Sequence, residues 1–493
     1  MTGRAPRLVP LGAGLAVVAA GLLFAAAYVP HGADLAAALV GLAVLASLAY
    51  LAWHVDPAWL FTAAVIGSTF NGNWGDLGVP GGIPPDRLVL LAGIGGLILY
   101  SPPARDRPPF RARPIHGLLA LTVVWAIGSG IAAHTLSEGS VQFYILDRMA
   151  VPFAVFALAP LAFNSPRHRA GFLTAMVWYG AYLGLTAFFE IVGPHQLVFP
   201  HFILDTGWGT ERAQGPFIEP AVNGLALYVC AITSVIALAT WKGRRRILAG
   251  TTLFLCVLGL LFTLTRSAWI AAIIATAVTL AVAPGLRRYL LPVTVATMAL
   301  VLAALAVLPG FEASVQQRTD NQLTVWERRN VNAAALNMVS NRPLFGFGIG
   351  RFNDDNRDYF PLQSDIPMFV TTQIALHNVF LLLAVELGLI GATLYAASLL
   401  TVVGSALASR GPPEMRRWRI GLLAIALYWI VGAQFVPLGQ VFPNMIVWMW
   451  AGIVLGGASE VTELASNGRR QAPPIAPTDE LALRSPAIGE GGL

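Results

Sequence analysis

Two arginines and one histidine are placed where apolar runs meet polar segments. Arg266 lies between two apolar runs that have almost no loop between them, and Arg212 leads into another run, with Glu219 close behind. His377 begins a third run, and that run also contains Glu386. A guanidinium group can bond two phosphate oxygens at once, and a neutral imidazole can accept a proton near neutral pH. These residue types suit a site that binds a diphosphate and moves a proton.

Each of these residues also has an ordinary structural interpretation. Arg266 can snorkel from a helix end to lipid headgroups. Arg212 can form a loop salt bridge to Glu211 or Glu219. A single histidine at a membrane interface is usually structural, although His377 is flanked by both a long polar segment and a run with an internal carboxylate. Both kinds of interpretation remain open at the level of single residues.

The composition of the chain requires a membrane around these residues. Hydrophobic residues make up 56% of the chain and charged residues 11%, and the mean hydropathy is +0.67, whereas a soluble surface needs far more charge. Spanning segments in lipid must satisfy their own backbone groups, so helices of roughly 20 apolar residues are expected. We predict an all-α integral membrane protein with about 14 transmembrane helices, within a range of 12 to 14. The predicted spans are 8–29, 33–53, 57–71, 86–101, 115–135, 147–164, 170–192, 219–241, 247–264, 267–284, 290–309, 377–404, 419–437 and 440–458.

The basic residues predict the orientation of these spans. If the N-terminus is cytoplasmic, 21 of the 31 Lys and Arg residues fall in cytoplasmic segments, which satisfies the positive-inside rule. The prediction is therefore N-in/C-in, with the first run retained as a span. The net charge of +6 then reflects topology and contact with anionic membrane lipids, and no nucleic-acid partner is expected. Cys230 and Cys256 lack the spacing of metal ligands, so no metal site is predicted.

The segment 310–376, which is external in this topology, is too long to be a simple connector. Apolar residues at helical spacing between Trp326 and Val339 predict a helix that lies on the membrane surface. The glycine-punctuated stretch 343–350 would let the backbone approach another group closely. A phosphate cradle is a weak interpretation of it, because the stretch lacks the strand-to-helix setting of a nucleotide fingerprint.

Five sequence pieces, in this order, resemble the O-antigen ligase and polymerase family. Each piece is unspecific alone, but together they cover roughly residues 210–400, whereas the first 200 residues match only as generic spans. The pieces are Arg212–Phe217 with Pro220 and Asn223, Thr265-Arg266-Ser267, the run from Arg318 through Trp326 to Asn341–Phe352, His377-Asn378, and Glu386–Gly391.

The resemblance implies a membrane glycosyltransferase without a cofactor, nucleotide sugar or metal. It would move a glycan from an undecaprenyl diphosphate carrier to a hydroxyl on a glycan, lipid or polymer acceptor, at the external face of a bacterial inner membrane. His377 would be the catalytic histidine, and Arg212 and Arg266 would hold the diphosphate. Loop contacts would come from Arg328, Arg329, Arg342 and Arg351, and support from Glu219, Asn378 and Glu386.

The same resemblance suggests a division of the chain. N-terminal helices occupy 1–209, the ligase-like catalytic region occupies 210–404 with its external loop, C-terminal helices occupy 405–459, and a disordered cytoplasmic tail occupies 460–493. The chain departs from the family in having more predicted spans than is typical, which leaves the packing of its N-terminal third open.

Three alternatives remain open. Ligase and polymerase differ only in the acceptor, which no motif identifies. A transporter or flippase of lipid-linked glycan would also be apolar and many-spanned, with Glu190 and Glu386 as coupling carboxylates. Against it stand the lack of an internal repeat and the one-sided clustering of Arg212, Arg266 and His377, since a transporter needs polar groups near the midplane. A non-catalytic scaffold would tolerate replacement of all three residues.

Overall fold

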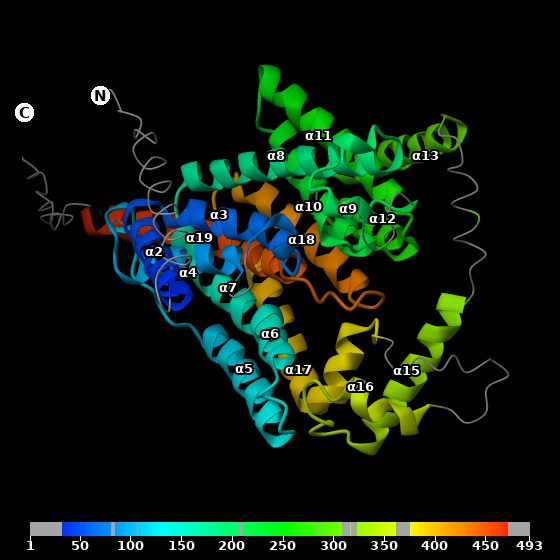
Figure 1. The fold of residues 1–493 in the computed structure, drawn as a ribbon. Coiled ribbons are helices and arrows are strands. Elements are labelled where there is room, and N and C mark those ends of the chain that lie inside the picture. Colours follow the sequence, from blue (N-terminus) through cyan, green and yellow to red (C-terminus); the bar gives the residue numbers. More distant parts are fainter. Residues whose placement is uncertain are drawn as a thin grey trace, which may run out of the picture.

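The computed structural model describes most of the chain. The described residues are 32–79, 84–105, 107–205, 207, 211–283, 285–307, 316, 323–360 and 375–471. All regular secondary structure within these ranges is helical. The all-α prediction is therefore confirmed for this part of the protein, and the helices form one bundle (Figure 1).

The described residues contain helices from residue 32 to residue 471. Their bounds are α2 Gly32–His54, α3 Pro57–Gly67, α4 Pro85–Ile98, α5 Pro114–Ala132, α6 Gly139–Ile145, α7 Val151–Ala162, α8 Pro166–Ile191, α9 Phe202–Asp205, α10 Pro220–Leu238, α11 Gly243–Phe262, α12 Arg266–Val282, α13 Leu290–Val307, α15 Leu323–Asn341, α16 Phe352–Asp355, α17 Val379–Ala408, α18 Met415–Gly432 and α19 Val441–Gln471.

Local sequence sets many of these helix starts. Five helices, α3, α4, α5, α8 and α10, begin with proline, whose fixed φ suits the first helical position and whose missing N–H is not needed there. A side-chain oxygen caps several of them: Asp56 accepts from the Ala58 N–H at 2.8 Å, and Glu219 accepts from the Ala221 N–H at 3.4 Å. Such caps satisfy backbone donors that the first helical turn leaves free.

Seven helices in the described residues are long and apolar enough to cross a membrane. The predicted span at 8–29 lies outside the described residues, and each of the other thirteen overlaps a helix. Three of these helices are apolar but shorter, so the total of about fourteen stays a prediction. The seven are Pro114–Ala132, Gly139–Ala162, Pro166–Ile191, Pro220–Leu238, Gly243–Phe262, Val379–Ala408 and Val441–Ala458.

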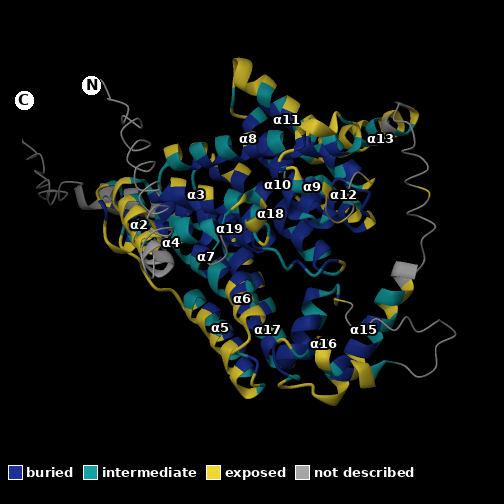
Figure 2. Ribbon diagram, viewed as in Figure 1, coloured by how far each residue is buried: buried dark blue, intermediate teal, exposed yellow. Residues whose placement is uncertain are grey.

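The bundle has a buried centre and an apolar periphery. In α10 and α19, 83% of the apolar window is buried, compared with 22% in α5. Figure 2 shows the buried residues gathered on α10, α18 and α19 and the exposed ones along α5 and α11. Trp429, Trp448 and Trp450 are almost fully enclosed in this centre. The apolar exposed faces of the outer helices are what lipid contact requires.

Helix α17 is broken at Gly388, where φ is 69° and ψ is 177°. A break leaves backbone groups without helical partners, so other groups must satisfy them. Residues 343–350 provide these partners, and we call this stretch, together with the break, the glycine clasp. Its backbone hydrogen bonds run from Leu389 N–H to Pro343 O (2.7 Å), from Phe347 N–H to Val385 O (2.9 Å) and from Gly348 N–H to Glu386 O (2.9 Å).

The clasp requires glycine because the backbones almost touch. A Cβ atom at Gly388 would lie 2.0 Å from the Leu344 carbonyl oxygen, and one at Gly346 would lie 2.5 Å from the Gly388 nitrogen. A Cβ atom at Gly348 would lie 2.2 Å from the Cβ atom of Ala133. The close approach predicted for this stretch is therefore made to α17 and to the end of α5. The glycines give no support to the phosphate-cradle interpretation.

One further prediction is confirmed in part and one is wrong. The helix predicted near Trp326–Val339 exists as α15, and its face with Val331, Ala335 and Met338 packs with Leu382 of α17. Its position on the membrane surface stays a prediction. These apolar side chains are covered by protein because the clasp holds the end of α15 beside α17 (Figure 1). The tail predicted as disordered from residue 460 continues as helix α19 to Gln471, and residues 472–493 lie outside the described ranges.

Candidate functional site

Arg212 and Arg266 meet at the start of α12. The Nε–H of Arg212 donates to the Thr263 carbonyl at 3.1 Å, and its terminal guanidinium nitrogen donates to the hydroxyl of Thr265. Thr265 is the residue directly before α12, and Arg266 is the first residue of that helix. Both arginines thus stand at a helix N-terminus, where the helix dipole already favours an anion.

Buried polar groups fix the segment that carries Arg212. The Glu190 carboxylate accepts from the backbone N–H groups of Gln214 and Gly215, each at 3.2 Å. The side-chain amide of Asn223 donates to the Ala213 carbonyl at 3.0 Å. Since these groups lie in α8 and α10, the backbone that leads Arg212 to α12 is held from two sides. The intramembrane Glu190 therefore has a structural partner in this loop.

His377 lies at the entrance to α17, beside the end of α18. Asn378 caps α17 by accepting from the Leu381 N–H at 3.0 Å, and its side-chain amide donates to Gln434 Oε1 at 3.0 Å. The Val379 N–H donates to the Ala433 carbonyl at 2.8 Å. These bonds join the N-terminus of α17 to the C-terminus of α18 and fix the backbone on which the half-buried His377 stands.

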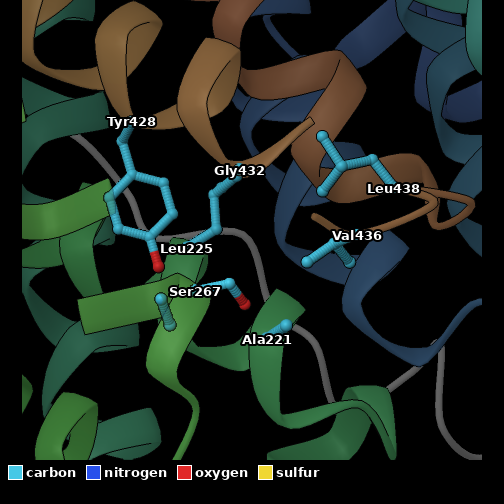
Figure 3. A pocket seen from close by; sticks show the side chains of 8 residues that line it. Ala221, Leu225, Ser267, Tyr428, Gly432, Val436 and Leu438 are labelled. Carbon is cyan, nitrogen blue, oxygen red and sulfur yellow. The ribbon is translucent and has the colours of Figure 1, made fainter. Parts of the chain in front are cut away.

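A small apolar pocket lies beside the start of α12 and the end of α18. It is lined by Ala221 near the start of α10, Ser267 near the start of α12 and Gly432 at the end of α18. Figure 3 shows Ser267 and Ala221 opposite Tyr428 and Gly432 across this pocket. Ser267 directly follows Arg266. Gly432 directly precedes Ala433, whose carbonyl oxygen accepts a hydrogen bond from the Val379 N–H at the start of α17. The N-termini of α10 and α12 therefore line the same pocket, and the N-terminus of α17 is hydrogen-bonded to the end of α18, which also lines it.

Helix α15 brings a further arginine to this region. Val331, one turn after Arg328, packs in the same cluster as Leu376, the neighbour of His377. Burial lowers the pKa of Arg328, and the positive charge of Arg266 lowers it further, while Glu219 and then Glu327 act in the opposite direction. Arg328 therefore lies within electrostatic reach of both Arg266 and Glu219.

The same arginine acts on the histidine. Burial is the larger cause that lowers the pKa of His377 to about 4, and the charge of Arg328 lowers it further. Burial raises the pKa of Glu219, against the charges of Arg212 and Arg328 and its hydrogen bond from Ala221, which lower it. The structure thus joins His377, Arg328, Glu219 and the two predicted diphosphate-binding arginines into one electrostatic cluster, which we call the arginine site.

Part of this region matches the model of a known family. Residues 251–396 match the model of the O-antigen ligase family. We call these matched residues the O-antigen ligase domain. The resemblance recognised in the sequence is confirmed by this match. A comparison with curated proteins found no match to the chain.

The O-antigen ligase domain contains most of the arginine site. It includes Arg266, Arg328 and His377, and it ends within α17. Arg212 and Glu219 precede the matched residues. Arg212 is connected to the domain by its hydrogen bonds to Thr263 and Thr265. Glu219 is connected to it by the electrostatic interaction with Arg328.

The other predicted arginines of the O-antigen ligase domain have different surroundings. Arg329 is exposed beside Arg328. Arg342 lies over the ring of Phe347, 4.8 Å from its centroid. Arg351 forms ion pairs with Asp354 at 3.4 Å and with Asp355 at 3.0 Å, both within its own segment.

Glu386 is buried in α17 next to the glycine clasp. The charge of Arg148 acts on it, and Tyr144 lies nearby. The guanidinium of Arg148 in turn lies 4.0 Å from the centre of the Tyr144 ring. Glu386 therefore belongs to a buried network between α17 and the helix that contains Arg148, and it gives the clasp its polar support.

Sequence reasoning named Arg328 only as one of four possible loop contacts and Ser267 only as part of the Thr265-Arg266-Ser267 piece, and it did not identify Gln434. The only available signal for Arg328 was its position three residues before Val331, on the face that packs against α17. That signal cannot be interpreted without knowing which surface α15 covers. Among the described residues, no group of three or more His, Cys, Asp or Glu side chains could hold a metal ion.

Proposed function

We propose that the protein transfers a glycan from an undecaprenyl diphosphate carrier to an acceptor hydroxyl at the external face of the inner membrane. The observation that supports the proposal is the arginine site inside and beside the O-antigen ligase domain: Arg212 is hydrogen-bonded to Thr265, directly before Arg266, and Arg328 links Arg266 electrostatically to the half-buried His377. Such a site combines binding of a doubly charged diphosphate with acceptance of a proton.

The arginines stabilise the leaving group. When the bond between the anomeric carbon and the phosphate oxygen breaks, the electron pair stays on the diphosphate, and its negative charge grows. Charge-assisted hydrogen bonds to a guanidinium contribute about 1.5 to 3 kcal/mol each, and they strengthen as this charge develops. Arg212 is held in place by Thr263 and Thr265, while the exposed Arg266 is free to turn toward the phosphates.

His377 accepts the proton of the attacking hydroxyl. With a pKa of about 4 it is neutral at neutral pH in the donor-free protein, so its ring can act as a base. A base with so low a pKa is weak, but the bound diphosphate offsets the charge of Arg328 and raises the pKa toward the ordinary value for histidine. The site offers one base for a single displacement, and a single displacement inverts the configuration at the anomeric carbon. We therefore propose inversion. Isolation of a covalent glycosyl-enzyme, which requires two displacements, would contradict it.

In vitro transfer tests this proposal. Purified protein in detergent receives undecaprenyl diphosphate-linked glycan and lipid, glycan or polymer acceptors, with and without EDTA. We expect product in wild type in both conditions and a loss of at least about a hundredfold in His377→Ala and Arg266→Ala. Arg329→Ala is the matched control, because it removes an exposed arginine next to the site.

The acceptor decides between the two activities proposed for this family. Transfer to a separate lipid or polymer acceptor supports a ligase, the activity we propose first, and transfer to another lipid-linked glycan supports a polymerase. Full activity in His377→Ala would contradict the catalytic role. Movement of carrier across proteoliposomes with no transfer to any acceptor would support a transporter instead.

A further inference from the structure

The arginine site contains a carboxylate that the proposed chemistry does not use. Glu219 caps α10 at the edge of the site, and both Arg212 and Arg328 act on its charge. In a site that binds a diphosphate, an anion among the arginines weakens ligand binding, since like charges repel. Capping alone does not require this charge, because asparagine or serine caps a helix as well as an acid does.

The reaction changes the charge of its lipid ligand. In the donor, both phosphates are esterified and the diphosphate carries two negative charges. After transfer, the bond from the anomeric carbon to the phosphate oxygen is replaced by a bond to the acceptor oxygen, and His377 holds the acceptor proton. The released diphosphate is a monoester and carries a third negative charge. A site with an excess of arginines would therefore hold the product more tightly than the donor.

We propose that Glu219 is a selectivity residue that limits the positive charge of the arginine site, so that the diphosphate monoester product leaves while the diester donor still binds. This proposal rests on the proposed function. Glu219 is suited to this role because its carboxylate caps α10 at Ala221, which lines the same pocket as Ser267 beside Arg266. Its charge also interacts with those of Arg212 and Arg328, so it offsets part of two positive charges. Glu327 acts on Arg328 as well, from α15 itself, but it is not among the groups that act on Glu219 or His377.

The test compares Glu219→Gln with Glu219→Asp in the purified full-length chain. The glutamine keeps an oxygen that can cap α10 and loses the charge, whereas the aspartate keeps both. Binding of undecaprenyl diphosphate, of geranyl diphosphate as a soluble monoester probe and of the intact donor is measured directly. Glu138→Gln, which removes an exposed acid elsewhere, is the matched control.

Coulomb energy scales with the charge of the ligand, so Glu219→Gln should tighten donor binding about tenfold and monoester binding about thirtyfold. Steady-state turnover should fall more than the single-turnover rate, because the single-turnover rate does not include product release. Glu219→Asp should keep the wild-type ratio of monoester to donor affinity, and Glu138→Gln should resemble wild type.

Equal tightening of donor and monoester, or no tightening, would overturn the proposal. So would a single-turnover rate that falls as far as the steady-state rate. The binding measurements do not depend on catalysis: if wild type transfers no glycan, the proposed function fails, whereas the ratio of the two affinities still reports on Glu219.

Discussion

The glycine clasp and the arginine site both adjoin α15 and α17, and they are built in opposite ways. In the clasp, Gly346, Gly348 and Gly388 bring backbones so close that a single Cβ atom does not fit. In the arginine site, Arg266 is exposed and Arg328 and His377 are only partly buried, and like charges face one another. The difference shows that the close backbone contacts of the clasp position α15 and α17, whereas the arginine site keeps an excess of positive charge, which suits the anion proposed to bind there.

The largest expected effect is in the clasp. Gly388→Ala places a Cβ atom 2.0 Å from the Leu344 carbonyl oxygen at a positive φ. We expect a loss of about 3 kcal/mol or more in the free energy of unfolding, from strain and displaced backbone. Thermal unfolding in detergent, followed by size-exclusion chromatography, measures the loss.

Gly404→Ala is the control in the same helix, because a Cβ atom there meets nothing within 4 Å. It should leave stability unchanged or raise it by up to about 1 kcal/mol, since alanine favours a helix over glycine. Equal stability of the two variants would show that the close contact at Gly388 relaxes without cost.

The next effect separates Arg212 from Arg266, the two arginines proposed to bind the diphosphate. Arg212 uses both Nε and a terminal nitrogen in hydrogen bonds to Thr263 and Thr265, a geometry that lysine cannot reproduce. We expect Arg212→Lys to lose about a hundredfold in kcat/KM and Arg266→Lys about tenfold, because the exposed Arg266 needs mainly its charge. Initial rates of transfer measure both. A larger loss in Arg266→Lys would reverse the roles assigned to the two residues.

The smallest effect is on pH dependence. The pKa of His377 is lowered to about 4 by burial and by Arg328, so the neutral base persists as pH falls and is lost only when pH passes below that pKa. Removing the like charge in Arg328→Gln favours the protonated ring and raises the pKa toward 6.5. We expect the acid limb of kcat/KM, which reports the free enzyme, to move upward by about one pH unit.

The pH profile of Arg329→Gln is the control for that shift, since Arg329 is exposed and is not among the groups that act on His377. An acid limb that stays in place in Arg328→Gln would show that burial alone sets the pKa of His377, and it would remove α15 from the electrostatics of the site.

The sequence by itself determined the membrane class, the all-helical fold and the position of most helices. These follow from apolar composition and from local signals such as Pro220 and Asn378 at helix starts, which act over a few residues. It also singled out Arg212, Arg266 and His377. Placing an ionisable side chain at the edge of an apolar run costs free energy, so such a residue is a candidate for a functional role.

Only the tertiary structure decided which of the other polar residues join them. Arg328 and Arg351 have similar settings in the sequence, but the packing of Val331 beside Leu376 brings Arg328 to the site, whereas Arg351 pairs with acids in its own segment. The break at Gly388 and its partner stretch 343–350 are likewise visible only in three dimensions. The physical reason is that burial and electrostatic contact depend on which helices pack together, and periodicity within one helix does not encode its partner.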